Sequence, residues 1–572
     1  MLNLLPWLDA HAGIYRLVAG GATAVYAAWV VVECRRPEAV ARPRCTELLA
    51  GLLLLGLLLA WRWPALLAPD YLNPDEAQLV AGAITLEHDP CFWRSLDGTT
   101  SGPLNFAALL PTHWLGVPQD YLNARLAGLL MVWGALWAGR AWLRLDYDRA
   151  TVALGLLPGV VFFSTATDSE FIHYSSEHCS LLLMSAAAWL LWLSHRRGWA
   201  AGTPGMTGSL AALLAGALPW AKLQSAPFAA ALVAWGGWLI LTSPLPRSAR
   251  LRRLATFVLM ALAPTGFVLL GAAVMGRWHD LVQATLLNNF AYVSDGISLA
   301  ASVRKLAYNS HATLSFPALF CGSLLLAGGA GAGLALARRR PRPLFWVTGL
   351  AVAVAVLVVL APRHGYRHYL IYLALPLTCW VTASLAEVRA LPAGAAFRAG
   401  FYALAGLVVF GGQFGARLVQ PPPFLFGRFT AAWQGRDDGP GRLVRGLMRP
   451  GDTLAVWGWN CDLYVVTGLP QATHEAHTER QIQPGAQRDG YYRPRYLADL
   501  ERNRPAFFVD AVGPKAFGFD NRERDGHESV PALRDYIGSH YVLAGESGAC
   551  RIYVRTDRAA GLPDEPGPGP RK

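Results

Sequence analysis

Charged residues are scarce in this chain of 572 residues: they make up 15% of it, whereas soluble domains carry about 25%. The shortage is concentrated in long apolar runs that are almost free of charge, such as 48–60, 254–275 and 344–361. A helix crosses the bilayer core with about 20 apolar residues, and roughly a dozen such segments recur here, too many for the buried helices of a soluble core. The sequence therefore predicts a polytopic α-helical membrane protein.

Several functional signatures are also missing. There is no Walker A sequence, which argues against direct use of ATP, and there is no glycine-rich dinucleotide fingerprint or zinc-like spacing of cysteines. The N-terminus lacks the charged region and cleavage site of a secretory signal peptide, so none is expected. The net charge of +12 comes almost entirely from arginine in short loops, which suits membrane orientation better than nucleic-acid binding.

The hydrophobic pattern predicts about twelve membrane-spanning helices. They fall near 14–33, 46–66, 122–140, 150–165, 179–194, 208–220, 226–242, 254–275, 312–337, 344–361, 369–386 and 399–416. Alternate loops differ in basic residues, with 19 in one set and 7 in the other, and the richer set is expected in the cytoplasm. The outward loops are then 67–121, 165–178, 276–311 and 362–368, and both termini face outward.

The chain changes character after residue 416. Residues 1–416 form the predicted membrane domain, and prolines and glycines mark a linker over 417–445. Strand-like runs at 453–459, 506–512 and 551–555 alternate with helix-compatible stretches, which predicts a small α/β domain over 446–556 on the outer face. The Pro- and Gly-rich tail 557–572 is predicted to be disordered.

Acidic residues gather in the first outward loop, where Asn73-Pro74-Asp75-Glu76 follows a predicted membrane helix and Ser101-Gly102-Pro103-Leu104 comes later. Acids at a helix N-terminus also suit the helix dipole, so the pair alone does not establish a site. The second outward loop adds Asp168, Glu170 and His173, residue types that together could hold a divalent metal.

Basic residues face the same side. Lys222 is one of only four lysines, and it is flanked by apolar helix. The stretch 362–369 contains Arg363, Arg367, His368 and Tyr369. These cations could bind a phosphate at the membrane surface, where arginine provides a bidentate grip; a snorkelling lysine and an ordinary Tyr/Arg interface anchor are the alternatives.

In their order and common side, these motifs resemble the GT-C superfamily of integral-membrane glycosyltransferases. The likeness is to the bacterial branch related to protein mannosyltransferases and lipid A aminoarabinose transferases, and it extends to Thr167-Asp168-Ser169, Ala221–Pro227, Arg367-His368-Tyr369 and Val456–Trp459. The resemblance implies an enzyme of the bacterial inner membrane, with a periplasmic C-terminal domain. It would transfer a sugar, with inversion, from a polyprenyl-phosphate donor to an acceptor hydroxyl on a glycan, a lipid or a protein.

The resemblance also assigns roles. Asp75 would be the general base, Glu76 would orient the acceptor or Asp75, and Asp168 would be the second acidic position. Lys222, Arg363, Arg367, His368 and Tyr369 would bind the lipid phosphate. A divalent metal at Asp75, Asp168, Glu170 and His173 stays open, because some members of the superfamily need a metal and others do not.

Three matters remain open from the sequence. A lipid-linked oligosaccharide polymerase or ligase and a transporter or flippase are alternative functions, and neither the sugar nor the acceptor can be identified. Cys461 and Cys550 could form a disulfide in an oxidising compartment, and Cys91 and Cys179 could also pair. The oligomeric state and the role of the C-terminal domain are not encoded in any motif.

Overall fold

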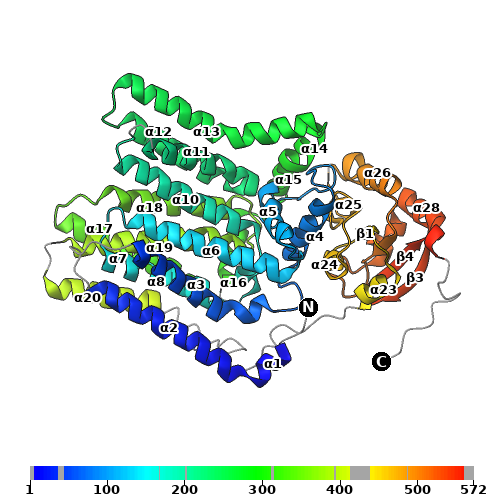
Figure 1. Cartoon of the computed structure of the whole chain (residues 1–572), viewed down its shortest axis with the longest axis horizontal. Helices are drawn as coiled ribbons and strands as arrows, with labels where there is room; N and C mark the ends of the chain where they lie inside the picture. Colours follow the sequence, from blue (N-terminus) through cyan, green and yellow to red (C-terminus); the bar gives the residue numbers. More distant parts are fainter. Residues whose placement is uncertain are drawn as a thin grey trace.

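A computed structural model of the chain describes residues 5–35, 44–166, 168–199, 203–310, 315–391, 394–411, 439–485 and 487–559. The molecule consists of a bundle of long helices and a smaller unit with a sheet at one end of it (Figure 1). The 417–438 part of the predicted linker, Thr167 and the tail from residue 560 lie outside the described residues.

Every predicted membrane segment is helical where it is described. The bundle contains α2 (Ala12–Arg35), α3 (Arg44–Leu66), α6 (Tyr121–Leu143), α7 (Arg149–Gly155), α8 (Leu157–Thr165), α10 (Ser176–Arg196), α11 (Thr203–Ala221), α12 (Ala226–Leu241), α13 (Arg247–Val274), α17 (Ser315–Leu336), α18 (Pro343–Leu360), α19 (Ile371–Arg389) and α20 (Ala395–Ala405). Among the described helices, nine are long and apolar enough to cross a membrane. The predicted count of about twelve is not confirmed, because 149–165 and 205–221 are shorter apolar segments and the last segment is described only to Gly411.

Helix α19 forms the centre of the bundle. Its apolar window is 94% buried, whereas that of α13 is only 17% buried, so α13 lies at the periphery. Helix α19 packs against α6, α7, α17 and α18. Where two helices meet closely a glycine is required: a Cβ on Gly155 of α7 would lie 2.6 Å from Cα of Thr382 in α19.

Two segments that the sequence predicts to face outward, called here the first and second outward segments, form short helices across one end of the bundle (Figure 1). The first contains α4 (Pro74–His88) and α5 (Pro103–Ala107). The second contains α14 (Trp278–Leu281), a π-helical turn (Val282–Leu287), α15 (Asn288–Ser294) and α16 (Leu299–Ser310). They are tied together by hydrogen bonds from Trp93 Nε1 to Thr285 Oγ1 (3.0 Å) and from Asn288 Nδ2 to the Thr99 carbonyl (3.2 Å).

The C-terminal unit is a four-stranded mixed sheet with helices. Its strands are β1 (Leu454–Trp457), β2 (Phe507–Asp510), β3 (Tyr541–Ser547) and β4 (Cys550–Arg555), in the order β1-β2-β4-β3. Only β1 and β2 are parallel to each other; the other two pairings are antiparallel. The sequence predicted three of these strands but missed β3, and one of the helix-compatible stretches between the strands is α28 (Pro531–His540).

Helix α23 (Gly439–Leu447) packs on β3, β4 and α24 (Asp462–Thr467), so the unit includes residues before the predicted start at 446.

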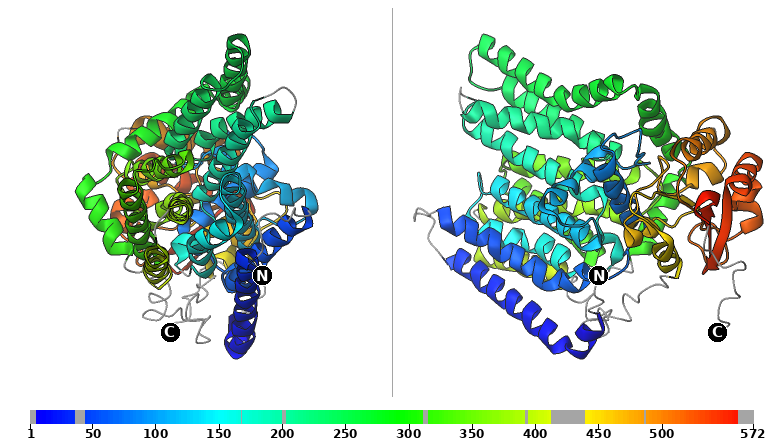
Figure 2. Two further views of the ribbon diagram at one scale, coloured as in Figure 1. Left: turned by 90° about the vertical axis from the view of Figure 1, so that its left-hand side faces the viewer. Right: turned by 45° about the vertical axis from the view of Figure 1, so that its right-hand side comes forward.

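The two faces of this sheet bury different partners, because side chains alternate along each strand. Leu454, Val456 and Val509 share one apolar core with Leu79 and Ile84 of α4. Trp457 and Phe508 face the other way, toward α26 (Arg493–Asn503) and α28. The C-terminal unit is therefore docked on the first outward segment by a common hydrophobic core. Figure 2 shows the position of this unit at the end of the bundle from two further sides.

The two cysteine pairs that the sequence leaves open form no disulfide in the described residues. Cys461, Cys550, Cys91 and Cys179 are all buried free thiols. Cys550 Sγ accepts a hydrogen bond from Asn460 Nδ2 at 3.5 Å, and Cys91 Sγ lies 3.3 Å from Met275 Sδ. The cysteine side chains thus pack as small apolar groups in the cores.

Candidate active site

Asp75 is presented at the start of α4. The helix begins at Pro74, and its N-cap residue Asn73 accepts a hydrogen bond from the Asp75 N–H at 2.9 Å. The Asp75 side chain is half-buried. Its helix α4 lies at the end of the bundle that faces the C-terminal unit (Figure 1). Proline at the first turn and an asparagine cap fix the direction in which this carboxylate leaves the helix.

The neighbouring Glu76 points elsewhere and is completely buried. Its carboxylate pairs with Arg125 of α6 at 2.8 Å and accepts hydrogen bonds from the N–H groups of Leu72 (3.0 Å) and Tyr174 (2.8 Å). Arg125 also donates to the Ala68 carbonyl at 2.6 Å. Both oxygens of Glu76 are used in these internal contacts, so its side chain is turned into the core, and its role in orienting the acceptor or Asp75 stays a prediction.

Asn73 connects the first outward segment to two distant parts of the chain. Its Nδ2 donates to Glu170 Oε1 at 2.8 Å, and the other oxygen of Glu170 lies 2.6 Å from His368 Nδ1. Burial raises the pKa of Glu170, but the hydrogen bond from His368 and its charge outweigh burial and lower this pKa to about 2. The short helix α9 (Ser169–Ile172) supports Glu170, and its N-cap Asp168 forms an ion pair with Arg367. For Asp168 burial dominates over Arg367, and the pKa is raised.

Lys222 lies between α11 and α12 and is buried. Its Nζ is 2.5 Å from Glu177 Oε1 and 4.9 Å from the centre of the Tyr369 ring. The Tyr369 hydroxyl is 2.7 Å from that of Tyr292 in α15. The Ser-Gly-Pro turn fixes this corner, because the Gly102 N–H donates to the Ala221 carbonyl at 2.8 Å, directly before Lys222.

Aromatic rings lead from these ion pairs toward solvent. Tyr366 stacks on His368 at 5.5 Å between ring centres and on His364 at 5.7 Å, and His364 lies 4.0 Å from Tyr292. Lys305 Nζ sits 4.7 Å above the Tyr366 ring.

In the described residues, Lys305 and Arg363 make no ion pair, whereas Lys222, Arg367 and His368 are each paired with a carboxylate. Arg363 instead donates to the Val293 carbonyl at 3.4 Å.

The C-terminal unit brings a further carboxyl group, Glu479, into this region. Burial, reinforced by the negative charge of Asp75 and opposed by Arg480, raises the pKa of Glu479 to about 7. Burial also raises the pKa of Tyr366, and both Glu479 and Asp75 raise it further. Asp75, Glu479 and Tyr366 therefore lie close enough to act on one another electrostatically, although they come from three distant segments.

Arg480 holds this part of the C-terminal unit against the first outward segment. Its Nη2 lies 2.8 Å from Asp97 Oδ2, and Arg495 Nη2 lies 2.7 Å from the same oxygen. The two guanidinium groups outweigh the effect of burial and hold the pKa of Asp97 well below its usual range. Both arginines also contact Glu475, so the docking contact is a buried charge network.

Three of the four residues considered as metal ligands are engaged otherwise. Asp168 and Glu170 pair with Arg367 and His368, and His173 Nδ1 is 2.7 Å from the Ser169 carbonyl of its own turn. Over the residues described, the geometry expected of a metal centre occurs at Asp510, His527 and Glu528, in the C-terminal unit. There, Arg551 already pairs with both carboxylates, so neither place is a good cation site.

No family model matches the chain, and no curated protein sequence matches it significantly. The fold is similar to the crystal structure of ArnT from Cupriavidus metallidurans bound to undecaprenyl phosphate, with a TM-score of 0.51 and 13% identity over 92% of this chain and 99% of that chain. ArnT is a member of the GT-C superfamily. This chain has the fold of ArnT, the fold that its resemblance to the GT-C superfamily implies. A looser match is the archaeal oligosaccharyltransferase AglB from Archaeoglobus fulgidus, in complex with an inhibitory peptide and a dolichol-phosphate, with a TM-score of 0.47, 11% identity and coverage of 91% and 75%.

Within the GT-C fold, the residues predicted from sequence come together at one end of the bundle, except that Glu76 turns into the core. Three residues of this region were not predicted from the sequence as site residues: Arg125, Lys305 and Glu479. Arg125 had a signal, since it is a lone cation near the end of an apolar segment. Glu479 had none, because it is one polar residue among many in 471–483.

Proposed function

We propose that the protein transfers a sugar from a polyprenyl-phosphate carrier to an acceptor hydroxyl, with inversion at the sugar C1 and with Asp75 as general base. The observation that carries this proposal is the convergence of three distant segments at one end of a bundle with the fold of ArnT. Asn73, beside Asp75, bonds Glu170, which bonds His368, while Arg367 next to it pairs with Asp168. The bound carrier of ArnT, undecaprenyl phosphate, is the kind of lipid that suits a site at a bundle end.

The chemistry needs a base and a stabilised leaving group. The Asp75 carboxylate takes the proton of the acceptor hydroxyl while the hydroxyl oxygen forms its bond to C1. The bond between C1 and the phosphate oxygen breaks, and the polyprenyl phosphate leaves with the electron pair. Cations at the site stabilise the charge that develops on that phosphate.

We further propose that the phosphate is received by Lys305 and Arg363, because neither is neutralised by a carboxylate in the part of the chain described. Lys222, Arg367 and His368 are held by Glu177, Asp168 and Glu170, so a phosphate would have to compete with these partners for their charge. These carboxylates keep the net charge of the deeper end of the site near zero. The two cations without an acidic partner, Lys305 and Arg363, lie at the mouth of the site, where Lys305 covers the Tyr366 ring.

On the acceptor side we propose that Glu479 lines the path to Asp75. A carboxyl group with a pKa near 7 can either donate or accept a hydrogen bond at neutral pH. It would orient an acceptor hydroxyl toward Asp75, so that the C-terminal unit contributes directly to acceptor binding.

The test compares Asp75→Asn with wild type in vesicles supplied with polyprenyl-phosphate donors that carry different sugars. The variant should lose at least about 100-fold in transfer, the loss typical of removing a general base, and should still bind undecaprenyl phosphate. Asp89→Asn is the matched control, since Asp89 belongs to the same loop but pairs with Arg94 and is exposed. Undiminished transfer by Asp75→Asn would remove it from this role, and lipid movement without glycosidic bond formation would indicate a flippase.

A further inference from the structure

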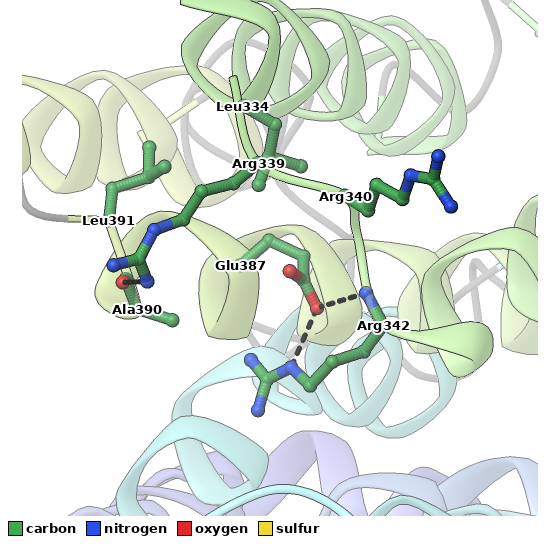
Figure 3. Close-up of a pocket in the computed structure, with 7 residues that line it drawn as sticks. All are labelled: Leu334, Arg339, Arg340, Arg342, Glu387, Ala390 and Leu391. Carbon is green, nitrogen blue, oxygen red and sulfur yellow. Dashed lines mark hydrogen bonds and ion pairs between the residues drawn. The ribbon is translucent and has the colours of Figure 1, made fainter. Parts of the chain in front are cut away.

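A polar cavity lies at the other end of the bundle from Asp75. Its volume is about 240 Å³, and it is lined by Leu334, Arg339, Arg340, Arg342, Glu387, Ala390 and Leu391. Figure 3 shows Arg342 bonded to Glu387, Arg339 extending toward Ala390 and Leu391 on one side, and Arg340 pointing away on the other side. The residues come from the end of α17, the turn that leads into α18, and the end of α19.

The turn that carries the arginines is locally strained. Arg338 has a φ of 51°, in the left-handed region where a side chain carries a steric cost. Two hydrogen bonds close the turn, from the Arg338 N–H to Ala335 (3.0 Å) and from the Arg339 N–H to Leu334 (2.9 Å). A glycine here would avoid the cost, so the conformation that presents Arg339 and Arg340 is maintained against a local preference.

The cavity has an excess of positive charge. Arg342 is committed, because its Nε lies 2.8 Å from Glu387 Oε1 and its guanidinium sits 4.6 Å from the centre of the Tyr147 ring. The Glu387 side chain is only 4% exposed and is neutralised by this pair. Arg339 gives one hydrogen bond, to the Ala390 carbonyl at 3.2 Å, and Arg340 has no partner in the part of the chain described. Three arginines against one glutamate leave a formal charge of +2.

We propose that this cavity binds a phosphate group, toward which the exposed side chains of Arg339 and Arg340 turn from its two sides, and that the natural source of this phosphate is the phosphodiester of an anionic phospholipid. The planar guanidinium groups can each offer two parallel donors to phosphate oxygens. Leu334 and Leu391 provide an apolar wall beside them for the glycerol end of a lipid. Basic pockets between membrane helices on the arginine-rich side of a protein are a known mode of headgroup recognition. This site is independent of the proposed transfer reaction and lies outside its residues.

The experiment uses the full-length protein, freed of lipid in detergent and analysed by native mass spectrometry with phosphatidylglycerol or phosphatidylcholine. The double variant Arg339→Gln/Arg340→Gln should retain at least fivefold less phosphatidylglycerol than wild type. The control is Arg247→Gln/Arg252→Gln, two exposed arginines in the first turns of α13 at the same end, which should bind as wild type does. Both pairs of arginines lie outside the buried cores, so thermal unfolding should confirm that both variants fold.

A second arm distinguishes a lipid from a soluble ion. Inorganic phosphate at millimolar concentration is added in place of lipid, and thermal stabilisation of wild type is compared with that of the Arg339/Arg340 variant. Stabilisation of wild type alone by phosphate, without retention of phosphatidylglycerol, would assign the cavity to a soluble anion. Equal retention of phosphatidylglycerol by both double variants, with no effect of phosphate, would overturn the proposal.

Discussion

Lys305, like Arg363, differs from Lys222, Arg367 and His368 because no carboxylate among the described residues pairs with it, and this difference can be measured. Replacing it with glutamine should weaken binding of undecaprenyl phosphate about tenfold, the effect of losing roughly 1.4 kcal/mol from a charge-assisted contact, and should raise the KM for the lipid donor. Arg304→Gln is the matched control on the same exposed helix. Equal binding by the two variants would show that the phosphate is held elsewhere.

Glu479 gives the folded protein a distinctive pH dependence. Its carboxyl group interacts electrostatically with Asp75, Arg480, Tyr366 and Tyr292. Its pKa of about 7 lies above its unfolded value of 4.5. Between these pH values the folded state binds more protons than the unfolded chain, so the free energy of unfolding falls as pH rises through this window. Glu479→Gln removes this loss.

Thermal unfolding of Glu479→Gln at pH 5 and pH 8 tests this sign. The midpoint of the variant should exceed that of wild type at pH 8, by about 2–4 °C for each kcal/mol regained, and the difference should shrink at pH 5. The exposed Glu501→Gln, in the same unit, should show no such divergence. A constant difference across the pH range would mean that Glu479 titrates normally.

At the level of elements, the turn at Gly102 connects the first outward segment to the end of α11. A Cβ at this position would lie 2.1 Å from the Trp220 carbonyl oxygen, so Gly102→Ala must push the turn away from the residues that precede Lys222. We expect reduced transfer and a loss of about 1–3 kcal/mol in stability, as for an overpacked contact. Gly446→Ala in α23, where a Cβ meets nothing within 4 Å, is the control for transfer activity and thermal unfolding.

The elements also show what the sequence could predict. Apolar length identified each spanning helix, and Asn73-Pro74-Asp75 contained both the cap and the proline that begin α4. The opposite fates of Asp75 and Glu76 could not be read, since they depend on Arg125, 49 residues further along the chain. Strand β3 was missed because only two of its seven residues are buried, so it lacks a clear alternating pattern.

The whole molecule depends on a charge network between its two parts. Asp97→Asn would leave Arg480 and Arg495 with less compensation for their charge in a buried place, and breaking such a pair typically costs about 3–5 kcal/mol. Hydrogen exchange should rise in residues 471–482 and in the first outward segment together, because the docking contact joins them. Exchange that rises in only one of the two segments would contradict a shared contact, and Asp535→Asn, at an exposed pair with Arg534, should leave both unchanged.

The contacts within the candidate site depend on the fold of the whole molecule. The resemblance to the GT-C superfamily brought Asp75, Asp168 and Arg367 into consideration, but their mutual contacts depend on the packing of helices separated by about 200 residues. Glu479 could not be found earlier, because its proximity to Asp75 results from the docking of the C-terminal unit.

The core that β1 and β2 share with α4 also imposes an order on biosynthesis. Leu79 and Ile84 leave the ribosome long before Leu454 and Val509, so the apolar surface of α4 must wait, incompletely covered, until the last fifth of the chain has been made and delivered to the same side. A polypeptide interrupted before that point would carry Asp75 without its finished surroundings. A prematurely terminated chain should therefore insert into the membrane but lack the proposed transfer activity, which would arise only at the end of synthesis.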